Sequence, residues 1–319
     1  MNPVYSVVIP VYNEQESLPE CHRRISAVMR SVGEPYELLF IDDGSKDESL
    51  RILRDICAAD SSAKCVSFSR NFGHMPAIAA GLDFALGDAV LVIDADLQDP
   101  PELFPEMISK WKEGFEVVYG KRAERRGESA FKRISAALYY RFLKSMTNVD
   151  MPLDTGEFRL IDRKVCDAIK RIREKNKYMR GLVSWVGFRQ TAVEYVRSER
   201  FAGQTKYPLS KMLKLAADGI TAFSYKPLKL ATTLGGFISL CSFVYLIFVL
   251  VQRLAWRSTA AGWASTVAIM LFFQGVVLMV LGVIGEYIGR IFEEIKDRPA
   301  YLVSEVIGAA QEGAEDGNG

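Results

Sequence analysis

The chain has 319 residues, enough to bury a sizeable core in one or two domains. Lys and Arg number 40 against 39 Asp and Glu, so the net charge of +1 gives no reason to expect a nucleic acid partner. Five cysteines without CxxC spacing indicate reduced thiols, and a total of two histidines argues against a histidine-rich zinc site.

Strands alternate with helices from the start of the chain. Tyr5–Pro10, Tyr36–Ile41 and Lys64–Ser69 read as strands, and the next strand begins at Val90. Each is followed by a loop and a helical pattern. Repeated strand–helix units of this kind predict a doubly wound, mostly parallel α/β sheet.

Two carboxylates end the second strand. Asp42 and Asp43 precede a helix, and Ser45 and Glu48 have the spacing of a capping box at its start. Carboxylates in this position can accept hydrogen bonds from a ribose hydroxyl or a base N–H. An ordinary Asp-rich turn is the alternative.

The fourth strand leads into the most informative stretch, Val90–Pro101. Its apolar run stops at Asp94, Asp96 and Gln98, which places oxygen ligands at the carboxyl edge of the sheet, where open α/β sheets bind ligands. Mg²⁺ and Mn²⁺ prefer such oxygens, and Mg²⁺ often combines one or two carboxylates with substrate phosphates. We therefore predict a metal–diphosphate site, with a solvated acidic turn as the alternative.

Two further ionisable residues invite a role in catalysis. His74 follows the third strand, but a lone histidine in such a loop is more often a structural hydrogen-bonding group. Glu157 begins a short strand, where it could orient an acceptor or form a salt bridge with Arg159 or with the basic loop that contains Arg122. The residues alone leave both roles of Glu157 open.

Two basic segments lie further along the chain. The first contains Arg122 and Arg126, and the second, residues 197–207, contains Arg200 and Lys206. Guanidinium groups bind phosphate in bidentate fashion, so these segments could contact a diphosphate or a phospholipid headgroup. Solvated basic loops are the alternative.

From Pro208 the composition becomes that of a membrane protein. Residues 208–226 place apolar side chains on one helical face, as in a helix that lies in the headgroup plane. Leu230–Val251 and Ser258–Gly285 contain no charged residue, and each reaches the roughly 20 apolar residues that cross a bilayer. We expect two transmembrane helices, at about 228–252 and 262–285.

Basic residues flank these spans mainly on one side. They precede the first span and follow the second, whereas the connecting loop carries Arg253 and Arg257. The positive-inside rule then places the N-terminal domain and the C-terminus together in the cytosol. The expected organisation is a cytosolic α/β domain at 1–207, an amphipathic helix at 208–226, two transmembrane helices within 227–289, and a surface helix with a disordered tail at 290–319.

Several segments, in order, resemble those of one enzyme family. They read VVIPVYNE, IDDGS, SRNFG, DADLQDPPE, DTGEFRL and RFAGQTKY. Together with two C-terminal spans they resemble glycosyltransferase family 2, and within it the polyprenyl-phosphate glycosyltransferases, which include dolichol-phosphate mannose synthases and bactoprenol glucosyltransferases. The resemblance extends almost to Arg298 and implies a nucleotide-sugar transferase domain of the GT-A type followed by two transmembrane helices.

The resemblance also implies roles for particular positions. It implies that a nucleotide sugar is bound by Pro10, Tyr12, Glu14, Asp42, Asp43, Asp94, Ala95, Asp96, Gln98 and Arg122. It further implies that Mg²⁺ or Mn²⁺ is held by Asp94, Asp96 and Gln98, the lipid phosphate by Arg126, Arg200 and Lys206, and the reaction by Asp96, Arg122 and Glu157. The family usually has Asp where this chain has Glu157, and the longer side chain displaces the carboxylate by a methylene.

The implied reaction is inverting transfer of a sugar from a nucleotide sugar to polyprenyl (undecaprenyl) phosphate at the cytosolic face of the bacterial inner membrane. We expect glucose from UDP-glucose, while GlcNAc, mannose, galactose and an aminoarabinose stay open. A phosphate monoester has a second pKa of about 6, so the acceptor is largely ionised and needs no strong base. On this mechanism Asp96→Ala abolishes transfer and Glu157→Gln is milder.

Two other functions fit parts of the sequence. A processive polysaccharide synthase of the same superfamily would need more spans and a QxxRW motif, which Gln252–Trp256 does not match. A nonenzymatic membrane scaffold that binds nucleotide sugars would have no need of the charged set Asp94, Asp96, Arg200 and Lys206. We also expect a homo-oligomer, with a tetramer as one arrangement, because an anchor of two spans is small.

Overall fold

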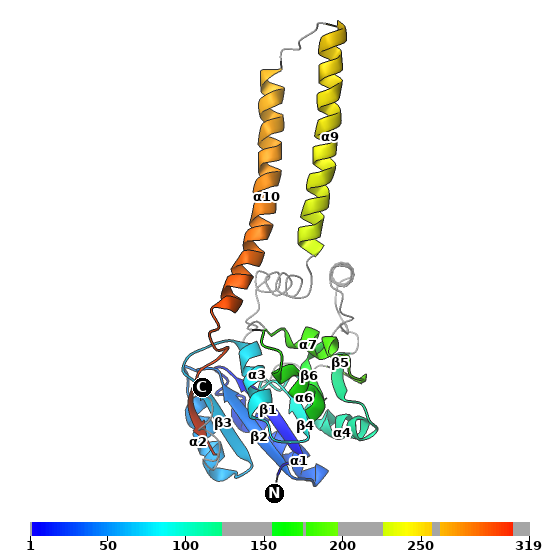
Figure 1. Cartoon of the computed structure of the whole chain (residues 1–319). Coiled ribbons are helices and arrows are strands. Elements are labelled where there is room, and N and C mark those ends of the chain that lie inside the picture. Colours follow the sequence, from blue (N-terminus) through cyan, green and yellow to red (C-terminus); the bar gives the residue numbers. More distant parts are fainter. Residues whose placement is uncertain (1, 123–154, 175–176, 197–225, 257–261, 309–319) are drawn as a thin grey trace. The chain divides into compact units, whose positions relative to one another are not determined.

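The structure is a computed structural model that describes residues 2–122, 155–174, 177–196, 226–256 and 262–308 (Figure 1). The chain divides into two compact units. One contains the N-terminal sheet together with the residues after Asp297, and the other contains the long C-terminal helices. The predicted helix at 208–226, except for Lys226, and the predicted phosphate ligands Arg126, Arg200 and Lys206 lie outside the described residues.

The first unit is built on one mixed sheet of eight strands in the order β7-β5-β6-β4-β1-β2-β3-β8. Strands β1 to β4 are parallel to one another, as predicted, whereas β6 runs antiparallel between β4 and β5, and β8 is antiparallel to β3. The strands are β1 (Tyr5–Val11), β2 (Tyr36–Asp42), β3 (Ala63–Phe68), β4 (Ala89–Val92), β5 (Val117–Arg122), β6 (Thr155–Asp162), β7 (Gln190–Tyr195) and β8 (Val303–Ile307).

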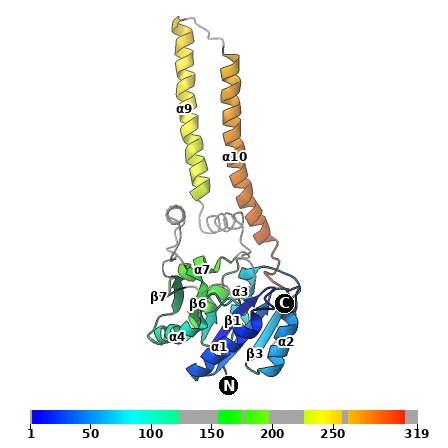
Figure 2. The same ribbon diagram turned by 180° about the vertical axis from the view of Figure 1, so that it is seen from behind.

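Helices cover both faces of this sheet (Figures 1 and 2). On one face α1 packs between α2 and α4, and on the other α3 packs against α6. The helices are α1 (Leu18–Val32), α2 (Ser49–Ala59), α3 (His74–Phe84), α4 (Phe104–Lys112), α6 (Arg163–Lys170) and α7 (Met179–Trp185), and the 3₁₀ turn η1 (Pro101–Leu103) precedes α4.

The core forms because the central strands are apolar on both sides. Every residue of β1 is buried, as expected for a parallel strand with a helix layer on each face. Tyr5 packs edge-to-face against Trp111 of α4, and Val8 faces Gly81 of α3. The doubly wound core predicted from the sequence is therefore present, within a sheet that is more mixed than expected.

The second unit consists of two long helices, α9 (Lys226–Trp256) and α10 (Trp263–Ile295), which lie alongside each other in both views (Figures 1 and 2). Within the described residues, Phe272–Phe292 of α10 is long and apolar enough to cross a membrane, and none of it is buried inside the protein. Ala231–Tyr245 of α9 is also apolar but shorter, so α9 is the weaker candidate.

The C-terminal segment differs from the expectation for 290–319. Instead of beginning a separate surface helix, residues 290–295 continue α10, because no proline interrupts the chain before Pro299 and Glu286 pairs with Arg290 one turn later at 3.1 Å. Val303–Ile307 then forms β8 at the edge of the sheet. The tail after residue 308 lies outside the described residues.

The contact between α3 and β1 predicts the effect of one substitution. A Cβ on Gly81 would lie 2.1 Å from Cγ1 of Val8, a stiff side chain at the centre of the sheet. We expect Gly81→Ala to destabilise the protein by about 1–3 kcal/mol, although Ala is the better helix former. Thermal unfolding of the purified protein should show a lower Tm for Gly81→Ala, and Val8→Ala/Gly81→Ala should recover part of the loss. A higher Tm for Gly81→Ala would contradict this close packing.

Candidate active site

The sheet topology collects the predicted site residues at one edge. Parallel strands β1, β2 and β4 end there, and the antiparallel strand β6 begins there. The β4–β6 ladder pairs Val92 with Arg159, and continuing this register by two residues brings Asp94 opposite Glu157. Two segments more than 60 residues apart in sequence therefore deliver carboxylates to the same place.

Asp94 lies just past the end of β4. Its Oδ1 atom is buried, is 3.4 Å from Nε2 of His74, and accepts no hydrogen bond from the described residues. Burial raises the pKa of the Asp94 carboxyl, and the negative charges of Asp96, Asp99 and Glu157 raise it further against the opposing effect of His74. This edge thus concentrates negative charge that a cation would neutralise.

A tight turn follows Asp94. Oδ1 of Asp96 accepts a hydrogen bond from the backbone N–H of Gln98 at 3.1 Å, and Leu97 between them has a φ of 58°. A left-handed conformation is costly for a leucine, and such strain is found at functional sites. Ala95 and Asp96 are buried, whereas Gln98 is half-buried.

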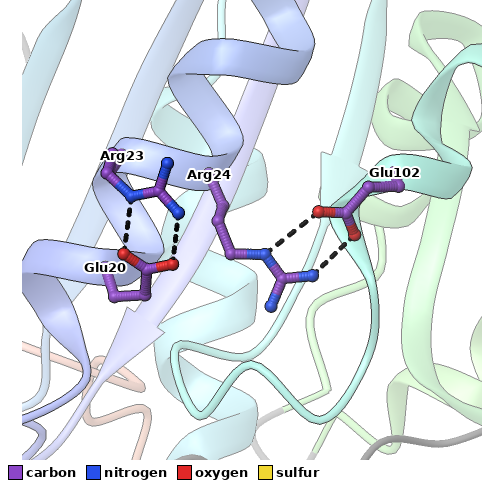
Figure 3. Close-up of polar contacts among 4 residues, drawn as sticks. All are labelled: Glu20, Arg23, Arg24 and Glu102. Atoms are coloured by element: carbon purple, nitrogen blue, oxygen red, sulfur yellow. Dashed lines mark hydrogen bonds and ion pairs between the residues drawn. The ribbon is translucent and has the colours of Figure 1, made fainter.

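The 3₁₀ turn that follows this loop is tied to α1. Arg24 donates two hydrogen bonds to Glu102 of η1, at 3.0 and 2.6 Å (Figure 3). The neighbouring pair Glu20–Arg23 in the same view lies within α1, so it connects no other element to the helix. The Arg24–Glu102 pair, which is bidentate, fixes the end of the Asp94–Pro101 segment.

The predicted metal ligands have the right chemistry for a divalent cation. The described residues contain no group of three or more His, Cys, Asp or Glu side chains arranged to hold a metal ion. The predicted set needs fewer, since it consists of two carboxylates and an amide that would be completed by substrate phosphates. The buried Asp94 oxygen without a hydrogen-bond donor fits a cation ligand.

Asp42 and Asp43 are both buried and both hydrogen-bonded within the protein. Asp42 accepts from the N–H of Ser45 at 3.1 Å and from the hydroxyl of Ser67 at 2.8 Å. Asp43 accepts from the loop after β3: from the backbone N–H of Phe72 (2.6 Å) and of Gly73 (2.9 Å), and from the Asn71 side chain (2.8 Å). Burial raises the pKa of Asp43, opposed by these two N–H groups.

The capping box predicted at Ser45 and Glu48 is not formed. Glu48 is the N-cap of α2 and makes no side-chain capping bond. The Ser45 hydroxyl instead accepts the N–H of Asn13 at 3.0 Å, so it joins the end of β1 to the end of β2. A partner distant in sequence has replaced the local one.

The residues after β1 form the neighbouring wall of the site. Pro10 is buried within β1, whereas the ring of Tyr12 is 36% exposed and available to a ligand. The Glu14 carboxylate accepts a hydrogen bond from the Ser17 hydroxyl at 3.0 Å, and the Glu14 N–H donates to Ser49 at 2.9 Å. Of the three, Tyr12 is the one most open to contact.

Glu157 is clamped between two arginines. Its Oε1 accepts from Nε of Arg180 at 2.6 Å, and its Oε2 lies 3.2 Å from Arg159. Burial by itself would raise the pKa of Glu157, but the charges of Arg159 and Arg180 outweigh it and the pKa is lowered. Of the two roles left open by the sequence, the salt bridge with Arg159 is present. Arg180, in α7, was not predicted, because nothing in the sequence links it to Glu157.

Arg122 ends β5 opposite Tyr195 of β7. The Tyr195 hydroxyl donates to the buried carboxylate of Asp99, and burial and Asp99 raise the pKa of this hydroxyl against the opposing effect of Arg122. A Cβ on Gly156 would lie 2.9 Å from an Arg122 nitrogen, so the glycine makes room for the guanidinium at the start of β6. Sequence reasoning missed Tyr195 and Asp99, although Asp99 lies in the same acidic segment as Asp94 and Asp96.

Two protein-family models match this chain. Residues 6–170 match Glycosyl transferase family 2, and residues 226–291 match the GtrB C-terminal hairpin. The first match contains Asp94, Asp96, Arg122 and Glu157, and the second contains most of α9 and α10.

Individual relatives match over nearly their full length. The chain is 59% identical to the uncharacterized glycosyltransferase YkcC of Bacillus subtilis, covering 95% of this chain and 94% of the relative. It is 46% identical to the uncharacterized glycosyltransferase sll0501 of Synechocystis, covering 95% of each. It is 40% identical to an SfII prophage-derived bactoprenol glucosyl transferase of Shigella flexneri, covering 93% of this chain and 96% of the relative.

Among solved structures, the chain is similar to a glucosyl-3-phosphoglycerate synthase from Mycobacterium tuberculosis, with a TM-score of 0.44 and 21% identity over 69% of this chain and 78% of the other. The family match over half of the chain and the identity to full-length relatives confirm the resemblance found in the sequence. The chain therefore belongs to glycosyltransferase family 2 and is a glycosyltransferase.

Proposed function

We propose that this glycosyltransferase transfers glucose from UDP-glucose to polyprenyl phosphate, with undecaprenyl phosphate as the bacterial acceptor. The observation that carries the proposal is the meeting of Asp94, Glu157 and Arg122 at one sheet edge in a chain that also has an apolar hairpin. A relative that matches 93% of this chain is named bactoprenol glucosyl transferase, which supports glucose and a polyprenyl carrier.

On the donor side, the nucleoside would lie over the ends of β1 and β2. Tyr12 offers an exposed ring to the base, and Pro10 and Glu14 shape the turn beside it. Asp42 and Asp43 would act largely through the turns that they hold, because their oxygens already accept several hydrogen bonds from the protein. Ala95 and Gln98 would line the diphosphate.

Asp94, Asp96 and Gln98 would hold the divalent cation, Mg²⁺ or Mn²⁺. Their oxygens match the preference of these ions, and the pKa of Asp94 is raised by burial and by the neighbouring carboxylates, against the opposing effect of His74. When bound, the cation neutralises charge on the departing diphosphate.

The chemical step would be a single inverting displacement. An oxygen of the acceptor phosphate forms a bond to the anomeric carbon, while the bond from that carbon to the β-phosphate oxygen breaks and its electron pair leaves with UDP. No proton is transferred, because the acceptor phosphate is already ionised above a pH of about 6. Arg122, at the end of β5, would stabilise the charge that develops on the leaving group.

Glu157 would act as a positioning residue in this reaction. Both of its oxygens are engaged by arginines, and its lowered pKa makes it a weak base. It would hold Arg180 and Arg159 in place beside the reacting phosphates.

The acceptor would be presented by the bilayer. We propose that α9 and α10 both span the membrane and that the sheet domain lies on the cytosolic face of the bacterial inner membrane, as the flanking basic residues predict. Arg126, Arg200 and Lys206 would then bind the lipid phosphate. Assembly into a homo-oligomer would enlarge the small membrane anchor.

The reaction can be tested directly with the purified full-length protein. We expect label from UDP-glucose to appear in a mild-acid-labile lipid when undecaprenyl phosphate is present, and other UDP-sugars or GDP-mannose to give far less product. A polymer that grows with time would point to a processive synthase instead. Absence of any lipid product with every donor would contradict the proposed acceptor.

The cation site gives a second prediction. Asp94→Asn and Asp96→Asn should each reduce transfer at least about 100-fold, since each removes a charge beside the diphosphate. Chelation should abolish activity in the unchanged protein, and Mg²⁺ or Mn²⁺ should restore it. Asp55→Asn, on the exposed surface of α2, is the matched control and should retain full activity. Full activity of Asp94→Asn in the presence of chelator would rule out the cation.

The role of Glu157 gives a third prediction. Glu157→Gln leaves the buried charge of Arg159 uncompensated, which should cost about 3–5 kcal/mol of stability, so its loss of activity will exceed the mild effect expected from the sequence. Glu157→Gln/Arg159→Met should recover much of the stability and some transfer. If the double variant is as stable as Arg159→Met alone but inactive, while Arg159→Met is active, Glu157 acts on the substrate itself.

The acidic limb of the pH–rate profile gives a fourth prediction. The lowered pKa keeps Glu157 ionised through the mildly acidic range, and the stability that it provides is lost only as the pH falls through that lowered value. The rate should therefore fall below a pH of about 6 because the acceptor phosphate becomes protonated. A phosphonate acceptor, which has a higher second pKa, should move this limb to higher pH. If the limb does not move, the group whose protonation lowers the rate belongs to the enzyme and not to the acceptor.

A further inference from the structure

The chain returns to the sheet after the membrane hairpin. Helix α10 ends at Ile295, and the short segment 296–300 leads to Tyr301 and β8. Strand β8 pairs antiparallel with β3, and the carbonyl of Leu302 accepts the N–H of Ser69 at 3.0 Å. The last described residues are therefore bonded to the start of the loop that leaves β3.

Tyr301 contacts both elements that this loop connects. Its ring stacks on Phe68, the last residue of β3, with 5.0 Å between centroids and 13° between planes. Its hydroxyl donates a hydrogen bond to Oδ2 of Asp83 in α3 at 2.9 Å. Residues 69–73 are the whole connection from β3 to α3. Tyr301 therefore contacts the residue from which this loop departs, Phe68, and is anchored in place by the far end of α3.

The loop carries this contact to the nucleoside end of the site. Phe68 packs edge-to-face on Phe72, with centroids 5.8 Å apart, and the Phe72 N–H donates to Asp43 at 2.6 Å. On the other side, a Cβ on Gly44 would lie 2.4 Å from the carbonyl carbon of Arg70, so the loop rests directly on the turn after Asp43. The contacts form an unbroken chain from Tyr301 through Phe68 and Phe72 to Asp43.

A second contact of the same strand lies away from the loop. Glu305 of β8 pairs with Arg54 of α2, and both side chains are substantially exposed. If β8 served only to cover the edge of the sheet, the loss of Tyr301 and the loss of this pair would affect stability alone. The contacts of Tyr301 and Glu305 therefore provide a matched comparison within one short segment, residues 301–307.

We infer that Tyr301 is a positioning residue for donor binding, which sets the loop 69–73 against Asp43 and thereby makes the affinity for the nucleotide depend on the segment that follows the membrane hairpin. This rests on the proposed function, in which the ends of β1 and β2 hold the nucleoside. It adds a residue far from the acidic loop and close in sequence to the membrane helices.

The test uses the full-length protein in detergent or nanodiscs, with initial rates against UDP-glucose and against undecaprenyl phosphate, and calorimetric binding of UDP alone. Tyr301→Ala should raise the KM for UDP-glucose and the Kd for UDP roughly tenfold, because an aromatic stack and a hydrogen bond are both lost. The kcat and the KM for the lipid should stay within about twofold of their starting values. Tyr301→Phe, which keeps the stack, should recover most of the donor affinity. Glu305→Gln, which weakens the Arg54 pair, should leave all three kinetic constants unchanged.

Two results would overturn the inference: an unchanged UDP Kd in Tyr301→Ala with a lowered Tm, or an equal rise in both KM values. Tyr301→Leu keeps apolar bulk without the planar stack, and it takes the place of Tyr301→Ala if that variant does not fold. Failure of the proposed function is recognised separately, since Tyr12→Ala and Asp43→Asn would then leave UDP binding intact in a folded protein.

Discussion

The antiparallel insertion of β6 between β4 and β5 is the constraint on which the site depends. Parallel strands alone would bring only their carboxyl ends to this edge, and the strand from Thr155 onward would begin at the opposite edge. Because β6 is reversed, Glu157 lies across from Asp94 in the continued ladder, and Gly156 lies under Arg122. One reversed strand thus places the Glu157 carboxylate and its partner Arg159 beside the acidic turn.

This arrangement brings four carboxylates within electrostatic reach of one another, those of Asp94, Asp96, Asp99 and Glu157. The surrounding residues compensate the negative charge of three of them to different extents. Asp99 accepts a hydrogen bond from Tyr195, and Glu157 is neutralised by two arginines, whereas burial raises the pKa of Asp94. The compensation is therefore complete around Glu157 and incomplete around Asp94, whose pKa stays raised although His74 lies 3.4 Å away. In the proposed function a cation and a diphosphate supply the rest.

The local sequence pattern was sufficient to predict the strands that consist of apolar runs. The apolar runs of β1 to β4 are buried on both sides and were predicted within one or two residues, and the turn at Asp94–Gln98 follows from the place where such a run stops. Long-range pairings could not be predicted in the same way. The Ser45 hydroxyl bonds the distant Asn13 instead of capping the helix that follows it. Arg180 bonds Glu157 from a helix that contains no recognisable motif. Strand β8 is short and half exposed, so its own residues give little indication of a strand. It is a strand because it pairs with β3.

The return of the chain to the sheet also determines how the hairpin of α9 and α10 is connected to the sheet unit. Because residues on both sides of α9 and α10 belong to the sheet unit, the hairpin is an insertion into that unit and not an appendage at its end. A chimera that exchanges membrane anchors between relatives would therefore need two junctions, with the second one upstream of Tyr301. A single fusion point before α9 would import a foreign strand into the host sheet along with the foreign anchor.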